Sequence, residues 1–275
     1  MSYDTFVSFK NTKNKTWRRN ARNIMETLIY KSSIAVHVLC GILSLASGLV
    51  AMTANKGGKV HNRAGLVFYW SMFMIFVTTS LFFILYPTNL KYQFFLGIGI
   101  VSFYPNWSGK RMLSMKKGLV PTTIDKIAAY LVGISGICML VYGAYLTQNP
   151  PKGFAGLNIL FFVFGTVSLA NAYGDLKVYL GFVKAEKMHW FFAHAGKMMG
   201  AYSAAITAFC VNIVPRFFPE NTPFFVFIIM WTAPGVIIGI LSARIIKKYQ
   251  AKFKIEAKPS IFSRIKLSFT KKELA

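Results

Sequence analysis

The four histidines are scarce side chains in this sequence that can bind a metal or carry a proton near neutral pH. His61 begins one long apolar run, and His189 and His194 begin another, so these three lie at the same membrane level. His37 lies early in the first apolar run, near the opposite level. Non-covalent haem takes two axial ligands from facing helices, and His61 with His194 meets that requirement.

The spacing within residues 188–214 separates the two histidines of that run. His189 and His194 are five positions apart, which is about 140° around an α-helix. They therefore cannot both face one site. His194 shares its helical face with Lys197, and small residues such as Gly196 and Gly200 follow. We expect His194 and Lys197 to turn toward the interior of the protein and His189 toward the lipid headgroups.

Further polar residues fall at the level of His61 and His194. Together they could line a shallow polar cavity, and ordinary interfacial capping and snorkelling is the simpler alternative. Arg63, Arg111 and Lys197 are the cations we expect to hold haem propionates. The other polar residues at this level are Asn106, Ser108, Lys110, Asp125, Asn171 and Asp175.

The elements that must position these residues are apolar runs of about 20 residues, the length that crosses a ~30 Å hydrocarbon layer. Backbone polar groups within lipid must be satisfied internally, which predicts an all-α, polytopic helical bundle. Glycines in the fourth and fifth runs favour close helix packing. We predict seven spans: Ser32–Ala54, Ala64–Tyr86, Leu90–Ser108, Ile127–Leu146, Phe154–Tyr173, Met188–Val214 and Phe224–Ala243.

The basic residues are distributed unequally between the two sides of this bundle. The formal net charge is +24, which we attribute to contact with anionic lipid headgroups and not with nucleic acid. The links after spans two, four and six carry only Lys91, Lys152 and Arg216. The positive-inside rule then predicts a multi-pass protein of the cell's inner (cytoplasmic) membrane with a cytoplasmic C-terminus. The links after spans one, three and five carry Lys56, Lys59, Arg63, Lys110, Arg111, Lys116, Lys117, Lys126, Lys177, Lys184 and Lys187.

Two basic segments flank the predicted bundle of residues 32–246. Residues 1–31 form a basic arm, and its apolar residues recur at helical spacing (Trp17, Ala21, Ile24, Leu28), which predicts an interfacial helix; a disordered arm is the alternative. The basic charge of this arm falls on the external side and opposes the charge of the loops. Residues 247–275 form a basic tail suited to an anionic membrane surface. The cysteines lie singly within spans, without a CxxC or CxxCH motif, which favours a packing role.

Four segments carry a resemblance to a known family: "HVLCG" (37–41), "GGKVHNRAGLVFYW" (57–70), "SGKR" (108–111) and "HAGKMMGAYSAAITAF" (194–209). They resemble a family of bacterial multi-pass membrane proteins of unknown function, in which histidines recur at the places of His37, His61 and His194. Val60 stands where that family has leucine. The resemblance implies the fold and this choice of histidines. A looser similarity runs to b-type membrane cytochromes.

Three functions remain open from the sequence. The first is a membrane redox protein that binds haem b through His61 and His194, with a quinone or a partner protein as its electron partner. The second is a metal-dependent membrane hydrolase, in which Asp125 or Asp175 joins the two histidines. The third is a non-catalytic bundle that binds a lipid or a partner protein. A coupled transporter is least favoured, because the spans hold almost no carboxylates.

Overall fold

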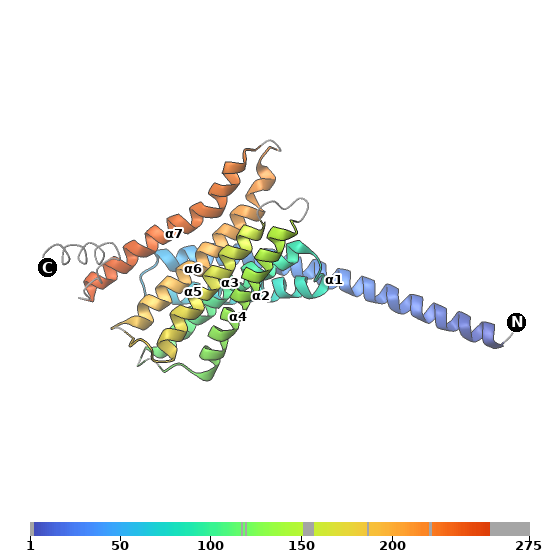
Figure 1. The fold of residues 1–275 in the computed structure, drawn as a ribbon, viewed down its shortest axis with the longest axis horizontal. Helices are drawn as coiled ribbons and strands as arrows, with labels where there is room; N and C mark the ends of the chain where they lie inside the picture. The colour runs from blue at the N-terminus through green and yellow to red at the C-terminus, as the bar shows by residue number, and fades with distance from the viewer. Residues whose placement is uncertain are drawn as a thin grey trace.

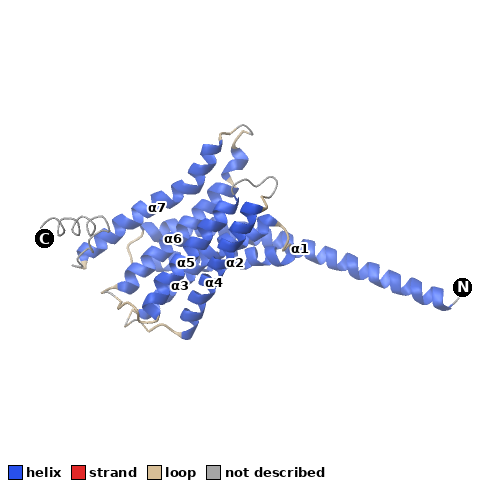
Figure 2. Cartoon of the chain, in the orientation of Figure 1, coloured by secondary structure: helices blue, strands red, loops and turns tan. Residues whose placement is uncertain are grey.

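The fold was analysed in a computed structural model, which describes residues 3–116, 118, 120–150, 157–185, 187–219 and 222–253. Within these ranges the chain forms α-helices and short 3-10 helices, and no strand (Figures 1 and 2). The all-α prediction is therefore confirmed. The α-helices are α1 (Tyr3–Thr53), α2 (Lys59–Leu85), α3 (Leu90–Met112), α4 (Thr123–Gln148), α5 (Leu157–Tyr179), α6 (His189–Asn212) and α7 (Phe224–Lys252).

Six of these helices are long and apolar enough to cross a membrane, and α3 is the exception. The predicted count of seven spans is thus supported for six helices. The reason lies in the surroundings of α3, which contacts α2, α4, α5 and α6. A helix with protein on several sides can carry polar residues that would be costly against lipid. Asn106 and Ser108 on α3 are both fully buried.

The remaining helices pack mainly as sequential pairs: α1 with α2, α4 with α5, and α6 with α7. The α4–α5 pair shows why glycine is needed at the crossing. A Cβ atom on Gly136 would lie 2.9 Å from the carbonyl oxygen of Gly165, and one on Gly165 would lie 2.8 Å from that of Gly136. The two backbones approach so closely that a larger residue would separate them.

The predicted boundaries of the flanking segments shift in the structure. Helix α1 runs without interruption through the predicted boundary at residue 31, and its N-terminal part projects away from the bundle (Figure 1). The described part of the arm is therefore helical and continuous with the helix of the first predicted span, and its place at the membrane interface stays a prediction. Helix α7 continues past residue 246 to Lys252. Residues 254–275, most of the predicted tail, lie outside the described residues.

One end of the bundle, which we call the basic end, gathers the residues of chemical interest. The antiparallel order of the helices brings together the C-terminal ends of α1, α3 and α7 and the N-terminal ends of α2 and α6. The lysines of the connecting segments lie here as well. The basic end is defined by Lys56, Lys59, Lys110, Lys116, Lys184 and Lys252.

Candidate functional site

A cavity of about 890 Å³ opens at the basic end between α1, α2, α6 and α7, with the end of α3 on one side. This volume lies in the range of roughly 300–1,000 Å³ that is usual for cofactor and small-molecule sites. Both His61 and His194 line it. The other lining residues are mainly apolar, aromatic or small, and within the described part of the chain no acidic residue lines the cavity.

The structure brings His61 of α2 and His194 of α6 next to each other across this cavity. Their ring centroids are 6.5 Å apart and the ring planes are nearly perpendicular, at 83°. Each ring is fixed by a backbone carbonyl at 2.8 Å from its Nδ1 atom. The carbonyl of Ala51, in the last turn of α1, accepts from His61, and the carbonyl of Gly109, in α3, accepts from His194.

These hydrogen bonds determine which nitrogen of each ring is available for a ligand. A carbonyl oxygen can only accept, so the Nδ1 atom of each histidine carries the hydrogen. In the neutral ring the Nε2 atom then has a free lone pair. Among the residues that the structure describes, no hydrogen bond to Nε2 of either ring is present. Metal-ligating histidines in proteins are commonly held in this way, with one ring N–H donating to a carbonyl and the other nitrogen free to bind the metal.

The cavity walls suit a flat or apolar ligand. Small residues flank both histidines: Gly65 lies one helical turn beyond His61, and Ala195 follows His194. Deeper in the bundle, Phe68 and Tyr202 pack edge to face, with centroids 6.0 Å apart. The mouth is bordered by an aromatic cluster that joins α6 to the end of α7, formed by Phe191, Tyr249 and Phe253.

Four lysines line the same cavity: Lys56, Lys110, Lys116 and Lys252. Lys56 is half-buried and donates to the carbonyls of Ala51 and Met52, 3.1 and 2.5 Å away. Burial lowers the pKa of the Lys56 ammonium group. In the part of the chain that the structure describes, none of the four lysines forms an ion pair.

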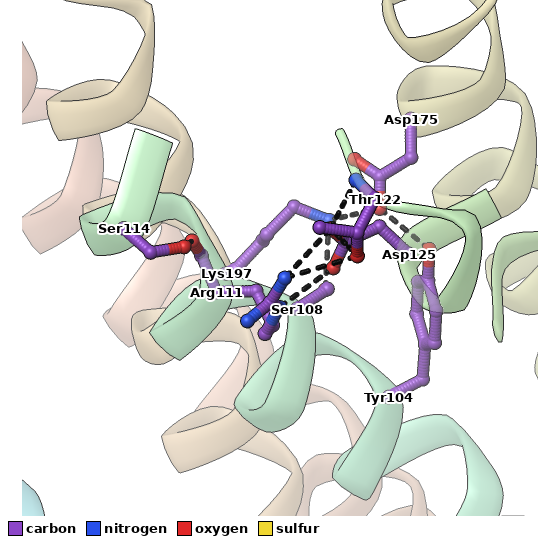
Figure 3. A network of polar contacts seen from close by, with 8 residues as sticks. All are labelled: Tyr104, Ser108, Arg111, Ser114, Thr122, Asp125, Asp175 and Lys197. Atoms are coloured by element: carbon purple, nitrogen blue, oxygen red, sulfur yellow. Dashed lines mark hydrogen bonds and ion pairs between the residues drawn. The ribbon is translucent and has the colours of Figure 1, made fainter. Parts of the chain in front are cut away.

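A closed polar network joins side chains of α3, α5 and α6 (Figure 3). Asp175 of α5 accepts from Lys197 Nζ of α6 and from the hydroxyl of Tyr104 of α3, both at 2.6 Å. Lys197 also donates to Ser108 at 3.0 Å. The Asp175 and Lys197 side chains are only 6% and 12% exposed. A buried pair with these additional hydrogen bonds ties three helices together.

A second ion pair extends this polar region to α4 (Figure 3). Arg111 of α3 binds Asp125 through two nitrogens, with Nε–Oδ1 and Nη2–Oδ2 distances of 2.7 and 2.9 Å. Thr122 also donates to Asp125, through its backbone N–H and its hydroxyl, and caps the start of α4. The Asp125 carboxylate is fully buried, and these donors account for both of its oxygens.

The predicted site residues therefore separate into two groups. His61 and His194 line the cavity, whereas Arg111 and Lys197, which we expected to hold propionates, are bound to carboxylates in the polar network. Arg63 is exposed and does not line the cavity. His37 donates from Nδ1 to Thr78, at 2.8 Å, on α2 and lies apart from the other histidines.

The same geometry bears on a hydrolytic metal site. That hypothesis needs a carboxylate beside the two histidines, but Asp125 and Asp175 are paired with Arg111 and Lys197. Among the described residues, no three side chains of His, Cys, Asp or Glu gather where they could hold a metal ion. The two histidines thus lack a third protein ligand of these types in the described part of the chain.

Several residues of the site were not expected from the sequence. Of the lysines that line the cavity, Lys110 was expected among the polar residues at this level, whereas Lys56, Lys116 and Lys252 were not, because they lie on separate segments and no local pattern marks them. The aromatic border at Tyr249 and Phe253 belongs to the region that was predicted to be a tail. By contrast, the Thr122–Asp125 cap has a readable signal, a threonine followed three residues later by an acid before an apolar run.

Comparisons with protein-family models, with curated proteins and with solved structures find no match to this chain. The resemblance to a bacterial membrane family through His37, His61 and His194 therefore stays a prediction. The geometry of the cavity and of its two histidines is what carries a functional assignment.

Proposed function

We propose that this protein is a membrane haem-binding protein that holds haem b between His61 and His194. The observation that carries the proposal is the pair itself. Two rings on different helices, each with Nδ1 fixed by a carbonyl, lie 6.5 Å apart between centroids. Metal–imidazole bonds of about 2.0–2.1 Å on each side of one metal atom place the two ring centroids roughly 6 Å apart.

A haem suits this cavity better than a bare ion. The porphyrin supplies four equatorial ligands, so the protein needs to provide only two axial ones, and only two histidines are present at the cavity. The small residues Gly65 and Ala195 leave space beside the ligating rings, and the apolar walls match the macrocycle. When bound, the haem iron would supply reversible one-electron chemistry.

The membrane arrangement that accompanies this proposal follows from the charge distribution. We infer that α3 crosses the bilayer as a seventh span, in contact with α2, α4, α5 and α6. We also infer that the basic end faces the cytoplasm. The cavity would then open on the cytoplasmic side of the inner membrane. A quinone or a partner protein is the class of electron partner available there.

The haem proposal is tested by an absorption spectrum of the full-length protein, purified in detergent from haem-replete cells. A Soret band with the sharp α and β bands of a reduced six-coordinate haem is expected. His61→Ala and His194→Ala should each abolish the bis-histidine spectrum, because each removes one axial ligand.

His37→Ala is the matched control for these variants, since His37 binds Thr78 away from the cavity and its loss should leave the spectrum unchanged. A colourless preparation of the wild-type protein that also takes up no added haemin would overturn the proposal. A spectrum that survives His61→Ala and His194→Ala but not His37→Ala would also contradict it.

The topology is tested separately with single cysteines placed at Lys59, Lys116 and Lys184 in a background without Cys40, Cys138 and Cys210. An impermeant thiol reagent added to intact cells should leave all three unlabelled, whereas a cysteine at Lys91 should react. The reverse pattern would place the basic end outside the cell.

A further inference from the structure

Axial ligation of haem by two histidines does not explain why four lysines line the same cavity. Arg111 and Lys197 each have a carboxylate partner within 2.7 Å, whereas Lys56 is half-buried and Lys110, Lys116 and Lys252 are exposed. Lys56, Lys110, Lys116 and Lys252 line one cavity, and no acidic residue among those that the structure describes lines it. Like charges gathered around a partly enclosed space attract anions and raise their local concentration.

Three of these ammonium groups are held in place by contacts on the cavity side of the protein. Lys116 Nζ lies 5.4 Å from the ring centroid of Trp190, and Lys252 Nζ lies 5.9 Å from that of Tyr249; both rings line the cavity. Lys56 Nζ binds the last carbonyls of α1. Cation–π contact orients a lysine without neutralising its charge, so the ammonium groups remain able to bind an anion.

The charge is confined to the mouth, whereas the interior of the cavity is apolar. Phe68, Met199 and Tyr202 line the cavity and belong to one buried cluster with Met72 and Ile238. A small hydrophilic anion would leave these apolar walls without a partner, and a neutral apolar molecule would leave the lysines without one. A ligand with an apolar body and an anionic end satisfies both parts.

We propose that the lysine-lined mouth is a binding site for the carboxylate or phosphate group of an amphiphile whose apolar part occupies the cavity. Two sources offer this chemistry: the propionates of the proposed haem and the phosphate of a membrane lipid. The inference goes beyond the haem proposal, because it concerns the lysines and does not require iron between His61 and His194.

The test compares two pairs of probes on the full-length protein in neutral detergent. The first pair is phosphatidylglycerol and phosphatidylcholine with the same acyl chains, followed by native mass spectrometry. The second pair is haemin and its dimethyl ester, in which both carboxylates are blocked, followed by absorption titration. Each pair differs in the anionic end and keeps the apolar body nearly unchanged.

The variant is Lys110→Gln with Lys116→Gln, and the matched control is Lys59→Gln with Lys184→Gln. All four lysines are exposed at the basic end, but Lys59 and Lys184 do not line the cavity. The cavity variant should bind an anionic probe about tenfold more weakly, because two lysines near an anion are lost. The control variant should bind as the wild type does, and the neutral probes should not distinguish the three proteins.

The pattern identifies the source of the anion. A loss confined to haemin assigns the lysines to propionates, a loss confined to phosphatidylglycerol assigns them to lipid phosphate, and a loss of both supports the shared site. Equal affinities of the cavity variant and the wild type for both anionic probes overturn the inference, as does an equal loss in the control. The two proposals fail separately, because the bis-histidine spectrum reports only on haem: a wild-type protein without that spectrum, whose cavity variant still loses phosphatidylglycerol binding, would overturn the haem proposal and support the anion site.

Discussion

His194 and Lys197 lie one turn apart in α6, yet they belong to two different polar regions, one a closed network and the other an open cavity. Lys197 enters the closed network, where it meets Asp175 and Ser108. His194 enters the open cavity, where its Nδ1 atom is bound to Gly109 and its other nitrogen has no hydrogen-bond partner among the described residues. Both regions take residues from α3, at adjacent positions 108 and 109.

The difference shows how polar groups that hold a membrane bundle together can be separated from those that serve a ligand. In the network, each cation has a carboxylate and each carboxylate has at least two donors. In the cavity, four lysines have no acid and two histidines each keep one nitrogen free of hydrogen bonds within the described residues. Cations that are paired with carboxylates stabilise the fold, whereas cations without a carboxylate partner beside a cavity indicate a binding site.

The largest effect is expected from breaking the closed network at Asp175. Asp175→Ala leaves the nearly buried ammonium group of Lys197 without its carboxylate, which should lower the free energy of unfolding by about 3–5 kcal/mol. The measurement is thermal or denaturant unfolding of the purified protein in detergent. The double variant Asp175→Leu, Lys197→Met removes both charges and should recover most of the loss. Wild-type stability of Asp175→Ala would show that the network is not structural.

A smaller loss is expected at the other ion pair. Arg111→Met removes the guanidinium group from Asp125, but the two hydrogen bonds from Thr122 remain, and the Arg111 side chain is already 33% exposed. The free energy of unfolding should fall by about 1–3 kcal/mol, measured as above. A loss exceeding that of Asp175→Ala would reverse the order that burial predicts.

Sequence patterns predict the helices and the pairing of histidines well, because both depend on local periodicity and on membrane level. Six of the seven predicted spans correspond to helices apolar enough to cross a membrane, and His61 lies beside His194. Helix α3 is less apolar than the other six candidate spans because it carries polar residues such as Asn106 and Ser108. These residues are buried within the protein. The helix that contacts four others is therefore the one that is less apolar than the rest.

Charge partners could not be predicted in this way, because they depend on which faces of distant helices meet. Arg111 and Lys197 were chosen as cofactor ligands for their level in the membrane, yet Asp125 and Asp175 lie across from them on α4 and α5. The lysines at the cavity come instead from loops and helix ends, such as Lys56 and Lys252. Membrane level limits which residues can meet, but only the packing of the helices decides which pairs form.

The lysines of the cavity should behave differently from the cations of the network. Lys116→Gln removes a positive charge that has no carboxylate partner in the described structure, so the free energy of unfolding of the ligand-free protein should change by no more than about 0.5 kcal/mol. The measurement uses protein delipidated in neutral detergent. A loss similar to that of Arg111→Met would mean that Lys116 has a structural role and that the two regions do not differ as described.

The smallest effect concerns the pH dependence of anion binding at Lys56. Burial lowers the pKa of this lysine from its ordinary 10.5, and an anion binds the protonated form more tightly. Affinity for phosphatidylglycerol should therefore be greatest below the lowered pKa and fall a few-fold as the pH rises through it, in a titration from about pH 7 to about pH 10.

Other titratable side chains also line the cavity, including His61, Lys110 and Tyr249, so the test depends on a comparison of variants. Lys56→Gln keeps a donor for the carbonyls of α1 and loses the titrating charge, so its binding should be weaker at neutral pH and vary less with pH. Identical pH profiles for the variant and the wild type would exclude Lys56 from the anion site and restrict that site to the other three lysines.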